Sequence, residues 1–363
     1  MTDGLRAIPD SAEDRELLAR FDDDIDMILD RARVVDNRDL LADMMRSTLG
    51  LGVDGVERLD LKIARAALRE MRAAYSVFAP YLDTPKVTIF GSARVTAADP
   101  LWNLTRDIAA ALANHGWMVV TGAGPGIMEA GMEGAGAERS IGVRIRLPFE
   151  IEANGIIARD PKLVSMNYFF TRKLMLVKES AAFVAMPGGF GTLDETIELL
   201  TLQQTGKSEP TPIVLLDVPS GNYWNGFARF IRDELVSRSM VNPDDMDRVL
   251  ITDSVEEARD EILRFWRNYH SLRWVGNLLV LRLNAPPSDD EIAELNDRFG
   301  HMLREGSIRR SDPLTPELAT GDELDRPRLV MDFDLHNVGS IHKIIRAVNE
   351  FPSAAPGGGV GGG

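Results

Sequence analysis

Cysteine is absent from this chain of 363 residues. Without it the chain has no disulfide, no thiolate nucleophile and no cysteine-based metal site. Basic residues are also scarce relative to acidic ones, 41 against 56, which gives a formal net charge of −15 and a pI near 4.9. A broad nucleic-acid or acidic-membrane surface needs a basic footprint, so neither partner is expected.

Long apolar runs are missing as well. No run approaches the roughly 20 residues of a membrane span, and the acidic N-terminal segment does not resemble a signal peptide, so we expect a cytoplasmic protein. The hydrophobic content of 44% is nevertheless enough for a substantial core. A small anionic ligand also remains compatible with the acidic chain, because N–H groups at helix N-termini bind anions without net positive charge.

The sequence predicts four segments that differ in composition and hydrophobic pattern. They are an N-terminal helical extension (1–85, with 1–12 frayed), a Rossmann-like nucleotide-binding catalytic domain (86–275), a small α+β appendage (276–351) and a flexible glycine-rich tail (352–363). In the extension an acidic, solvated face is expected in front of a packing stripe at near-helical spacing, formed by Leu61, Leu68, Met71, Tyr75 and Phe78.

Residues after Lys86 alternate between short apolar runs and helical stretches. The runs are KVTIF, WMVVT, IGVRI, AFVAM and PIVLLD, separated by helical stretches at 101–115, 126–137, 169–179 and 192–204. Apolar runs without polar alternation suit strands buried on both faces of a parallel sheet. The fold class is therefore α/β, a doubly wound parallel sheet that places ligands at the carboxyl ends of its strands.

The end of this domain and the appendage are predicted from the same kinds of pattern. A helix at 222–239, a VLIT strand and a helix capped by Ser254-x-x-Glu257 complete the domain near residue 270. The appendage repeats strand and helix twice, with LLVLRL and RLVMDF as strands and a polar loop at 305–327. For this appendage, packing or assembly is a better explanation than chemistry.

Two glycine-containing loops follow predicted strands. The first holds Gly91, Ser92 and Arg94, which suit an anion, although by itself a plain strand-end turn explains it better. The second contains Gly122, Gly124, Gly126 and Glu129. It fails the dinucleotide fingerprint G-x-G-x-x-G because an isoleucine replaces the third glycine, but it still favours a phosphate-binding loop over a structural turn.

The third loop opens a helix directly after AFVAM. It reads Pro187, Gly188, Gly189, Phe190, Gly191, Thr192, Leu193, Asp194 and Glu195. Its glycines expose N–H groups, and the helix N-terminus adds partial positive charge. Thr192-x-x-Glu195 also matches a capping box, so capping and catalysis stay equally open for Glu195. Upstream, Arg172 and Lys173 as an isolated pair are interpreted as helix-surface cations.

Taken together, these motifs resemble the LOG family, often mislabelled as lysine decarboxylases. The family's P-G-G-x-G-T-x-x-E motif is matched from Pro187 to Glu195, and an Arg-Lys pair precedes it at the family's spacing. FGSAR, GAGPGIMEA and IRLPFE also resemble family segments, over roughly 86–220. No pyridoxal-phosphate lysine context supports the decarboxylase label. Phe-Phe-Thr-Arg-Lys replaces the plant-type Met-His-x-Arg-Lys, which favours the AMP-cleaving bacterial branch over a cytokinin base.

The resemblance implies hydrolysis of a nucleoside 5′-monophosphate to free base and ribose 5-phosphate. It implies Glu195 and Arg172 as catalytic residues, with no metal and no cofactor. The substrate-binding residues are then Gly91, Ser92, Arg94, Gly122, Gly124, Gly126, Glu129, Lys173, Pro187, Gly188, Gly189, Gly191 and Thr192. A homodimer or dimer-based oligomer is also implied. The alternative is a non-catalytic nucleotide or cofactor carrier, or a sensor, of the same fold.

Overall fold

The computed structural model of the chain describes residues 19–147, 152–334 and 339–354. The predictions for residues 1–12 and for the glycine-rich tail beyond 354 lie outside these ranges. The chain divides into two compact units, residues 1–69 and 70–363. Within the described ranges, no helix combines the length and the hydropathy that a membrane span needs.

The first unit is helical. In it α2 (Asp22–Arg31) and α3 (Arg38–Val53) share a small core formed by Ile25, Leu29 and Ala42. The guanidinium of Arg46 lies 2.8 Å from the carboxylate of Asp22. A third helix, α4 (Arg58–Phe78), begins in this unit and ends in the second.

The packing stripe predicted for α4 is partly wrong. Leu61, Leu68 and Tyr75 are 42%, 45% and 44% exposed. The buried positions follow the helical period instead at Ala67, Glu70, Ala74 and Phe78. A helix with apolar residues on two faces does not reveal from its sequence which face is covered, and here the covered face includes a glutamate.

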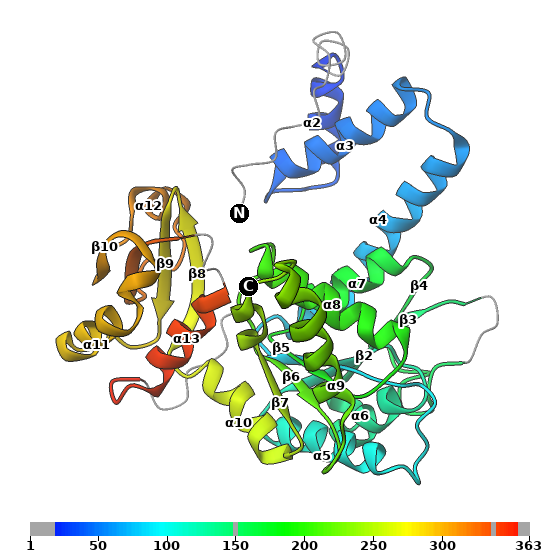
Figure 1. Cartoon of the computed structure of the whole chain (residues 1–363). Helices are drawn as coiled ribbons and strands as arrows, with labels where there is room; N and C mark the ends of the chain where they lie inside the picture. Colours follow the sequence, from blue (N-terminus) through cyan, green and yellow to red (C-terminus); the bar gives the residue numbers. More distant parts are fainter. Residues whose placement is uncertain (1–18, 148–151, 335–338, 355–363) are drawn as a thin grey trace. The chain divides into compact units, whose positions relative to one another are not determined.

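Seven strands of the second unit form one parallel sheet in the order β4-β3-β2-β1-β5-β6-β7 (Figure 1). The strands are β1 (Lys86–Phe90), β2 (Met118–Thr121), β3 (Ser140–Ile145), β4 (Leu163–Met166), β5 (Ala182–Ala185), β6 (Ile213–Leu216) and β7 (Val249–Thr252). Every neighbouring pair is parallel. The doubly wound α/β fold is therefore confirmed. The edge strand β4 does not appear among the predicted strands, because it is short and only alternately buried.

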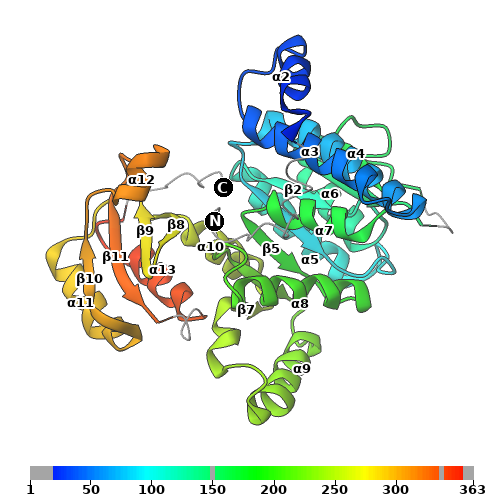
Figure 2. The ribbon, with the colours of Figure 1, turned by 90° about the horizontal axis from the view of Figure 1, so that it is seen from above.

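Helices cover both faces of this sheet (Figure 2). One core receives side chains from α5 (Pro100–Asn114), α6 (Ile127–Ala135) and α10 (Val255–Phe265). The other receives them from the end of α4 and from α7 (Phe169–Lys178), α8 (Phe190–Gln204) and α9 (Tyr223–Phe230). The helix predicted at 222–239 continues from α9 as a π turn (Ile231–Leu235) and a 3-10 turn (Val236–Arg238).

The appendage holds a second, antiparallel sheet in the order β10-β11-β9-β8. Its elements are β8 (Tyr269–Val275), β9 (Leu278–Leu283), α11 (Asp289–Phe299), β10 (Leu303–Arg310), α12 (Thr315–Thr320), β11 (Arg328–Phe333) and α13 (Ile341–Glu350). β8 thus lies before residue 276, within the range predicted for the catalytic domain. The polar loop predicted at 305–327 is wrong, since β10 and α12 occupy much of it. β10 reads as a loop because most of its side chains are exposed and polar.

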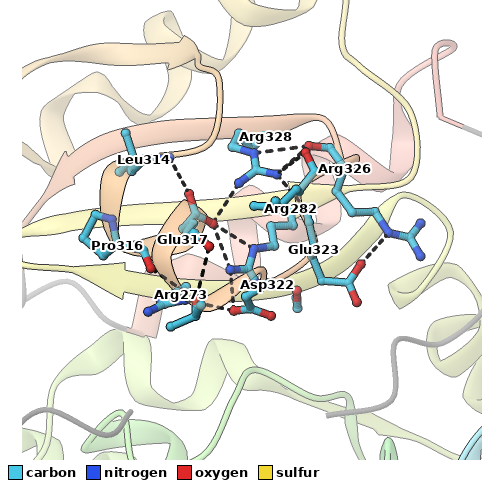
Figure 3. Close-up of polar contacts among 12 residues, drawn as sticks. Arg273, Arg282, Leu314, Pro316, Glu317, Asp322, Glu323, Arg326 and Arg328 are labelled. Atoms are coloured by element: carbon cyan, nitrogen blue, oxygen red, sulfur yellow. Dashed lines mark hydrogen bonds and ion pairs between the residues drawn. The ribbon is translucent and has the colours of Figure 1, made fainter.

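A buried ion cluster joins β9, β11 and α12 of the appendage (Figure 3). Glu317 is 0% exposed, and its Oε1 accepts a hydrogen bond from Nη2 of Arg282 at 2.8 Å and lies 2.9 Å from Nη1 of Arg328. Asp322 lies 2.7 Å from Arg282 at the edge of the cluster. Burial alone would raise the pKa of Glu317, but hydrogen bonds from the Leu314 N–H and from the arginines hold this pKa below its ordinary value.

Candidate functional site

The three glycine-containing loops follow β1, β2 and β5, which are neighbours in the sheet, and they meet at the backbone of Ser92. The Ser92 N–H donates to the Pro187 carbonyl at 3.2 Å, and the Ser92 carbonyl accepts from the Ile127 N–H at 3.0 Å. The strand order reverses at β1, where a doubly wound sheet opens a crevice for ligands. The structure therefore brings all three predicted loops together.

Some of the loop glycines are required by this close packing. A Cβ on Gly126, whose φ is +70°, would lie 2.4 Å from the Ser92 carbonyl oxygen. A Cβ on Gly188 would lie 2.9 Å from the Ser92 nitrogen and 2.2 Å from Oγ1 of Thr192. By contrast, a Cβ on Gly189 or Gly191 would meet no described atom within 4 Å beyond its chain neighbours and its own helix backbone. Packing of the fold therefore does not require glycine at these two positions.

The capping-box interpretation of Thr192 and Glu195 is wrong. Helix α8 begins at Phe190 with Gly189 as its N-cap, two residues before the predicted start, so Thr192 already lies inside the first turn. At α10 a side-chain cap of the predicted kind does form, where Oγ of Ser254 accepts from the Glu257 N–H at 3.2 Å. The first hydrogen bond within α8 runs from the Leu193 N–H to the Gly189 carbonyl. The N–H groups that precede it are those that a helix N-terminus offers to an anion.

Glu195 lies one turn further along α8, with its side chain 8% exposed. Among the described residues, its Oε2 atom accepts no hydrogen bond. The nearest cation is Lys173, whose Nζ lies 3.6 Å from Oε2. Burial raises the pKa of Glu195, against the opposing effects of Lys173 and Arg172. A buried carboxylate with an unused oxygen is a group suited to act on a ligand.

Lys173 and Arg172 are not the surface cations that they resemble in isolation. Nζ of Lys173 lies 2.6 Å from Glu198 and 2.9 Å from Asp194, so it links α7 to α8 beside Glu195. Burial lowers the pKa of Lys173, but the hydrogen bonds that its ammonium donates to Glu198 and Asp194 outweigh burial and leave this pKa raised.

The Arg172 side chain turns toward the second loop. Its Nε donates to the Val143 carbonyl at 3.1 Å. A Cβ on Gly122 would lie 2.2 Å from its Nη2, so the glycine makes room for the guanidinium. Burial lowers the pKa of Arg172, and the charge of Glu195 opposes this.

The remaining predicted residues lie at the rim or support the loops. Arg94 is exposed, and its N–H donates to Oγ of Ser92 at 3.1 Å. Glu129 is half-buried in the first turn of α6. A Cβ on Gly124 would meet only the flexible end of Met128. Gly91 packs tightly on Ile127, since a Cβ there would lie 2.5 Å from Cγ2 of that side chain.

Two supporting residues are missing from the sequence prediction. The Tyr223 hydroxyl donates to the Gly188 carbonyl at 2.7 Å, and burial raises the pKa of this tyrosine. Nδ2 of Asn154 donates to the Gly124 carbonyl at 3.1 Å. Tyr223 begins α9, the helix that follows strand β6, and this place beyond the carboxyl end of a strand is a signal that could have found it. Asn154 offers no comparable signal.

Metal-ligating clusters are absent from the part of the chain that the structure describes: no three His, Asp or Glu side chains there are grouped to hold an ion. The backbone N–H groups of the loops and the cations of α7 are instead suited to an anionic ligand.

Known proteins resemble the chain over this same region. Residues 124–262 match the family model described as possible lysine decarboxylase. The cytokinin riboside 5′-monophosphate phosphoribohydrolase of Mycobacterium tuberculosis is 29% identical over 174 residues, 47% of this chain and 90% of that protein. The protein of the same name from Mycobacterium marinum is 29% identical over 44% of this chain and 83% of its own length. An Arabidopsis thaliana relative of that name is 34% identical, but the match spans only 48% of it.

The solved structures that resemble the chain are less similar to it in sequence. The molybdenum cofactor carrier protein of Chlamydomonas reinhardtii is 23% identical, with 48% of this chain and 94% of that chain covered and a TM-score of 0.34. DNA processing protein A of Helicobacter pylori is 16% identical, with 50% and 82% covered and a TM-score of 0.36.

Three observations point to the same protein family. They are the family-model match, the mycobacterial relatives and the unbroken motif from Pro187 to Glu195. Over this region the chain resembles the LOG family.

Proposed function

We propose that this chain hydrolyses the N-glycosidic bond of a nucleoside 5′-monophosphate, with AMP or another purine monophosphate as substrate. The observation that carries the proposal is the buried Glu195 carboxylate, one turn from the glycine-rich start of α8, with an oxygen that accepts no hydrogen bond from the residues the structure describes. The relatives named as phosphoribohydrolases support the reaction class. The purine preference rests on the Phe-Phe-Thr-Arg-Lys departure in the sequence.

In the proposed reaction, the bond between C1′ and the base nitrogen breaks, and its electron pair leaves with the base. The sugar becomes oxocarbenium-like, and the Glu195 carboxylate stabilises this charge and accepts a proton from the attacking water. The water oxygen bonds to C1′, and the base takes up a proton at its nitrogen, which gives ribose 5-phosphate. The phosphate at the N-terminus of α8 anchors the sugar, so that binding energy contributes to positioning.

We expect AMP to be cleaved and adenosine to be a far poorer substrate, because adenosine lacks the phosphate anchor. The measurement is chromatographic separation of products after incubation with AMP, GMP, CMP, UMP, a cytokinin riboside monophosphate and adenosine. Turnover of adenosine comparable to that of AMP would contradict the anchor. Release of base from the cytokinin nucleotide alone would overturn the purine-monophosphate preference.

Gly191→Ala tests where the phosphate lies. The added methyl clashes with no residue that the structure describes, so the melting temperature should not fall. A phosphate held against the start of α8 would be displaced, and we expect the KM for AMP to rise on the order of tenfold, the equivalent of one charge-assisted hydrogen bond of about 1.5 kcal/mol.

Gly300→Ala is the matched control, since a Cβ there is equally unobstructed but lies in the appendage, at the end of α11. It should leave KM unchanged. An unchanged KM in the Gly191→Ala variant would show that the phosphate does not bind at this position.

The homodimer stays a prediction. Phe170 and Leu174 of α7 and Ile197 of α8 are 53%, 44% and 48% exposed, and we propose that these apolar side chains face a second copy of the chain.

A further inference from the structure

Glu70 of α4 is a buried carboxylate that none of the site motifs includes. It is 6% exposed and lies on the covered face of its helix. Its Oε1 accepts from the Asn167 backbone N–H at 2.9 Å and from Nδ2 of Asn167 at 2.6 Å, and its Oε2 accepts from Oγ1 of Thr171 at 2.7 Å. Burial raises the pKa of Glu70, but the hydrogen bonds from Thr171 and Asn167 outweigh burial and leave this pKa lowered.

These hydrogen bonds hold the start of α7. The N-cap of that helix is Tyr168, which makes no side-chain cap of its own. Glu70 therefore supplies, from another helix, the carboxylate that a helix N-terminus favours. Thr171, which Glu70 holds, immediately precedes the Arg172 and Lys173 of the site. The position of Arg172 against the Val143 carbonyl and the Gly122 loop thus depends on where this first turn lies.

A purely structural role does not explain a charge at this position. The neighbouring covered positions of α4 are Ala67, Ala74 and Phe78. Replacing a buried charge by an apolar side chain is often neutral or stabilising when only packing is at stake. What the carboxylate adds is a fixed geometry, because one oxygen holds Asn167, just before α7, while the other holds Thr171 within its first turn.

We infer that Glu70 is a positioning residue, which acts through the first turn of α7 to aim Arg172 at the bound nucleotide. The inference rests on the proposed function for its kinetic consequence only. Glu70 also lies outside the residues 124–262 that match the family model. The helix that precedes the sheet therefore takes part in the site.

The first test needs no activity. Amide hydrogen exchange over 167–175, and the rate at which phenylglyoxal modifies Arg172, are measured by mass spectrometry in the full chain. Both should rise in Glu70→Ala and rise less in Glu70→Gln, whose single amide oxygen still accepts hydrogen bonds at one of the two carboxylate positions. Phe78→Leu is the matched control, because it loosens the covered face of α4 but leaves the Glu70 carboxylate and its hydrogen bonds in place. It should leave both rates close to those of the wild type. Unchanged rates in Glu70→Ala would overturn the inference.

The second test is a double-mutant cycle on AMP turnover. Glu70→Ala should lower kcat about tenfold, as a small misplacement of a catalytic group does, with KM little changed because the glycine loops are intact. In an Arg172→Ala background the same substitution should have no further effect on kcat. If the two substitutions lowered kcat by factors that multiply in the double mutant, Glu70 would not act through Arg172. If the wild type cleaves no monophosphate, the proposed function fails, and the exchange and modification rates still decide the role of Glu70.

Discussion

Glu195→Gln should give a folded protein that binds AMP and turns it over on the order of 10²-fold or more slowly. Glutamine keeps the shape of the side chain and removes its charge, so the oxocarbenium-like sugar loses its counter-charge and water loses its base. The α8 N-terminus is unaltered, and the affinity for AMP should therefore survive. The measurements are kcat by product release and Kd by equilibrium binding.

Glu198→Gln provides the matched control. Glu198 lies on the same helix and pairs with the same Lys173 at 2.6 Å, but its side chain is 32% exposed. This variant should stay close to wild-type turnover, while Arg172→Ala should lose turnover along with Glu195→Gln. Near-wild-type turnover in Glu195→Gln would contradict the mechanism and favour a nucleotide or cofactor carrier.

The pH profile gives an independent check on the same residue. Because burial raises the pKa of Glu195, its ionised form is reached only above the ordinary value of 4.5. The rising limb of kcat/KM should therefore lie above that pH, and it should vanish in Glu195→Gln.

Glu317→Ala should destabilise the protein by about 3–5 kcal/mol, the usual cost of removing one partner from a buried ion pair. It leaves Arg282 and Arg328, which are 3% and 2% exposed, without their shared carboxylate. Urea unfolding followed by circular dichroism measures the loss. Asp332→Ala is a suitable control, because the guanidinium of its partner Arg304 is 46% exposed, and exposed pairs contribute little.

Acid titration tests how the contribution of Glu317 to the free energy of unfolding depends on pH. Its folded pKa lies below its ordinary value of 4.5, so its stabilisation is present above pH 4.5 and is lost as pH falls through the folded pKa. Glu317→Gln should flatten this part of the stability curve. An unchanged midpoint in both variants would mean that the cluster contributes nothing to stability.

The parallel sheet and its three loops could be predicted from the sequence because each rests on local pattern. KVTIF coincides with β1 residue for residue, and the glycine-rich segments follow their strands directly. The role of Thr192 and Glu195 could not be settled in this way. A shift of two residues in the start of α8 moves Thr192 from the cap into the helix, and local sequence rarely fixes a helix end that closely.

Other features depend on partners far away in the chain. Glu70 meets Asn167 across 97 residues, and no local pattern marks a single charge on an otherwise apolar face. β10 pairs with β11 through a mostly polar sequence, so it lacks the apolar alternation by which strands are recognised.

The central place of β1 has a consequence for synthesis. β1 is the first strand of the sheet to leave the ribosome, yet one of its two neighbours, β5, begins only at Ala182. Until then the nascent chain carries a largely apolar strand with an unpaired edge, a state prone to association with other chains. Pairing over so long a separation is intrinsically slow. The delay between translating Phe90 and translating Ala185 is therefore the interval in which this strand edge is most open to pairing with other chains.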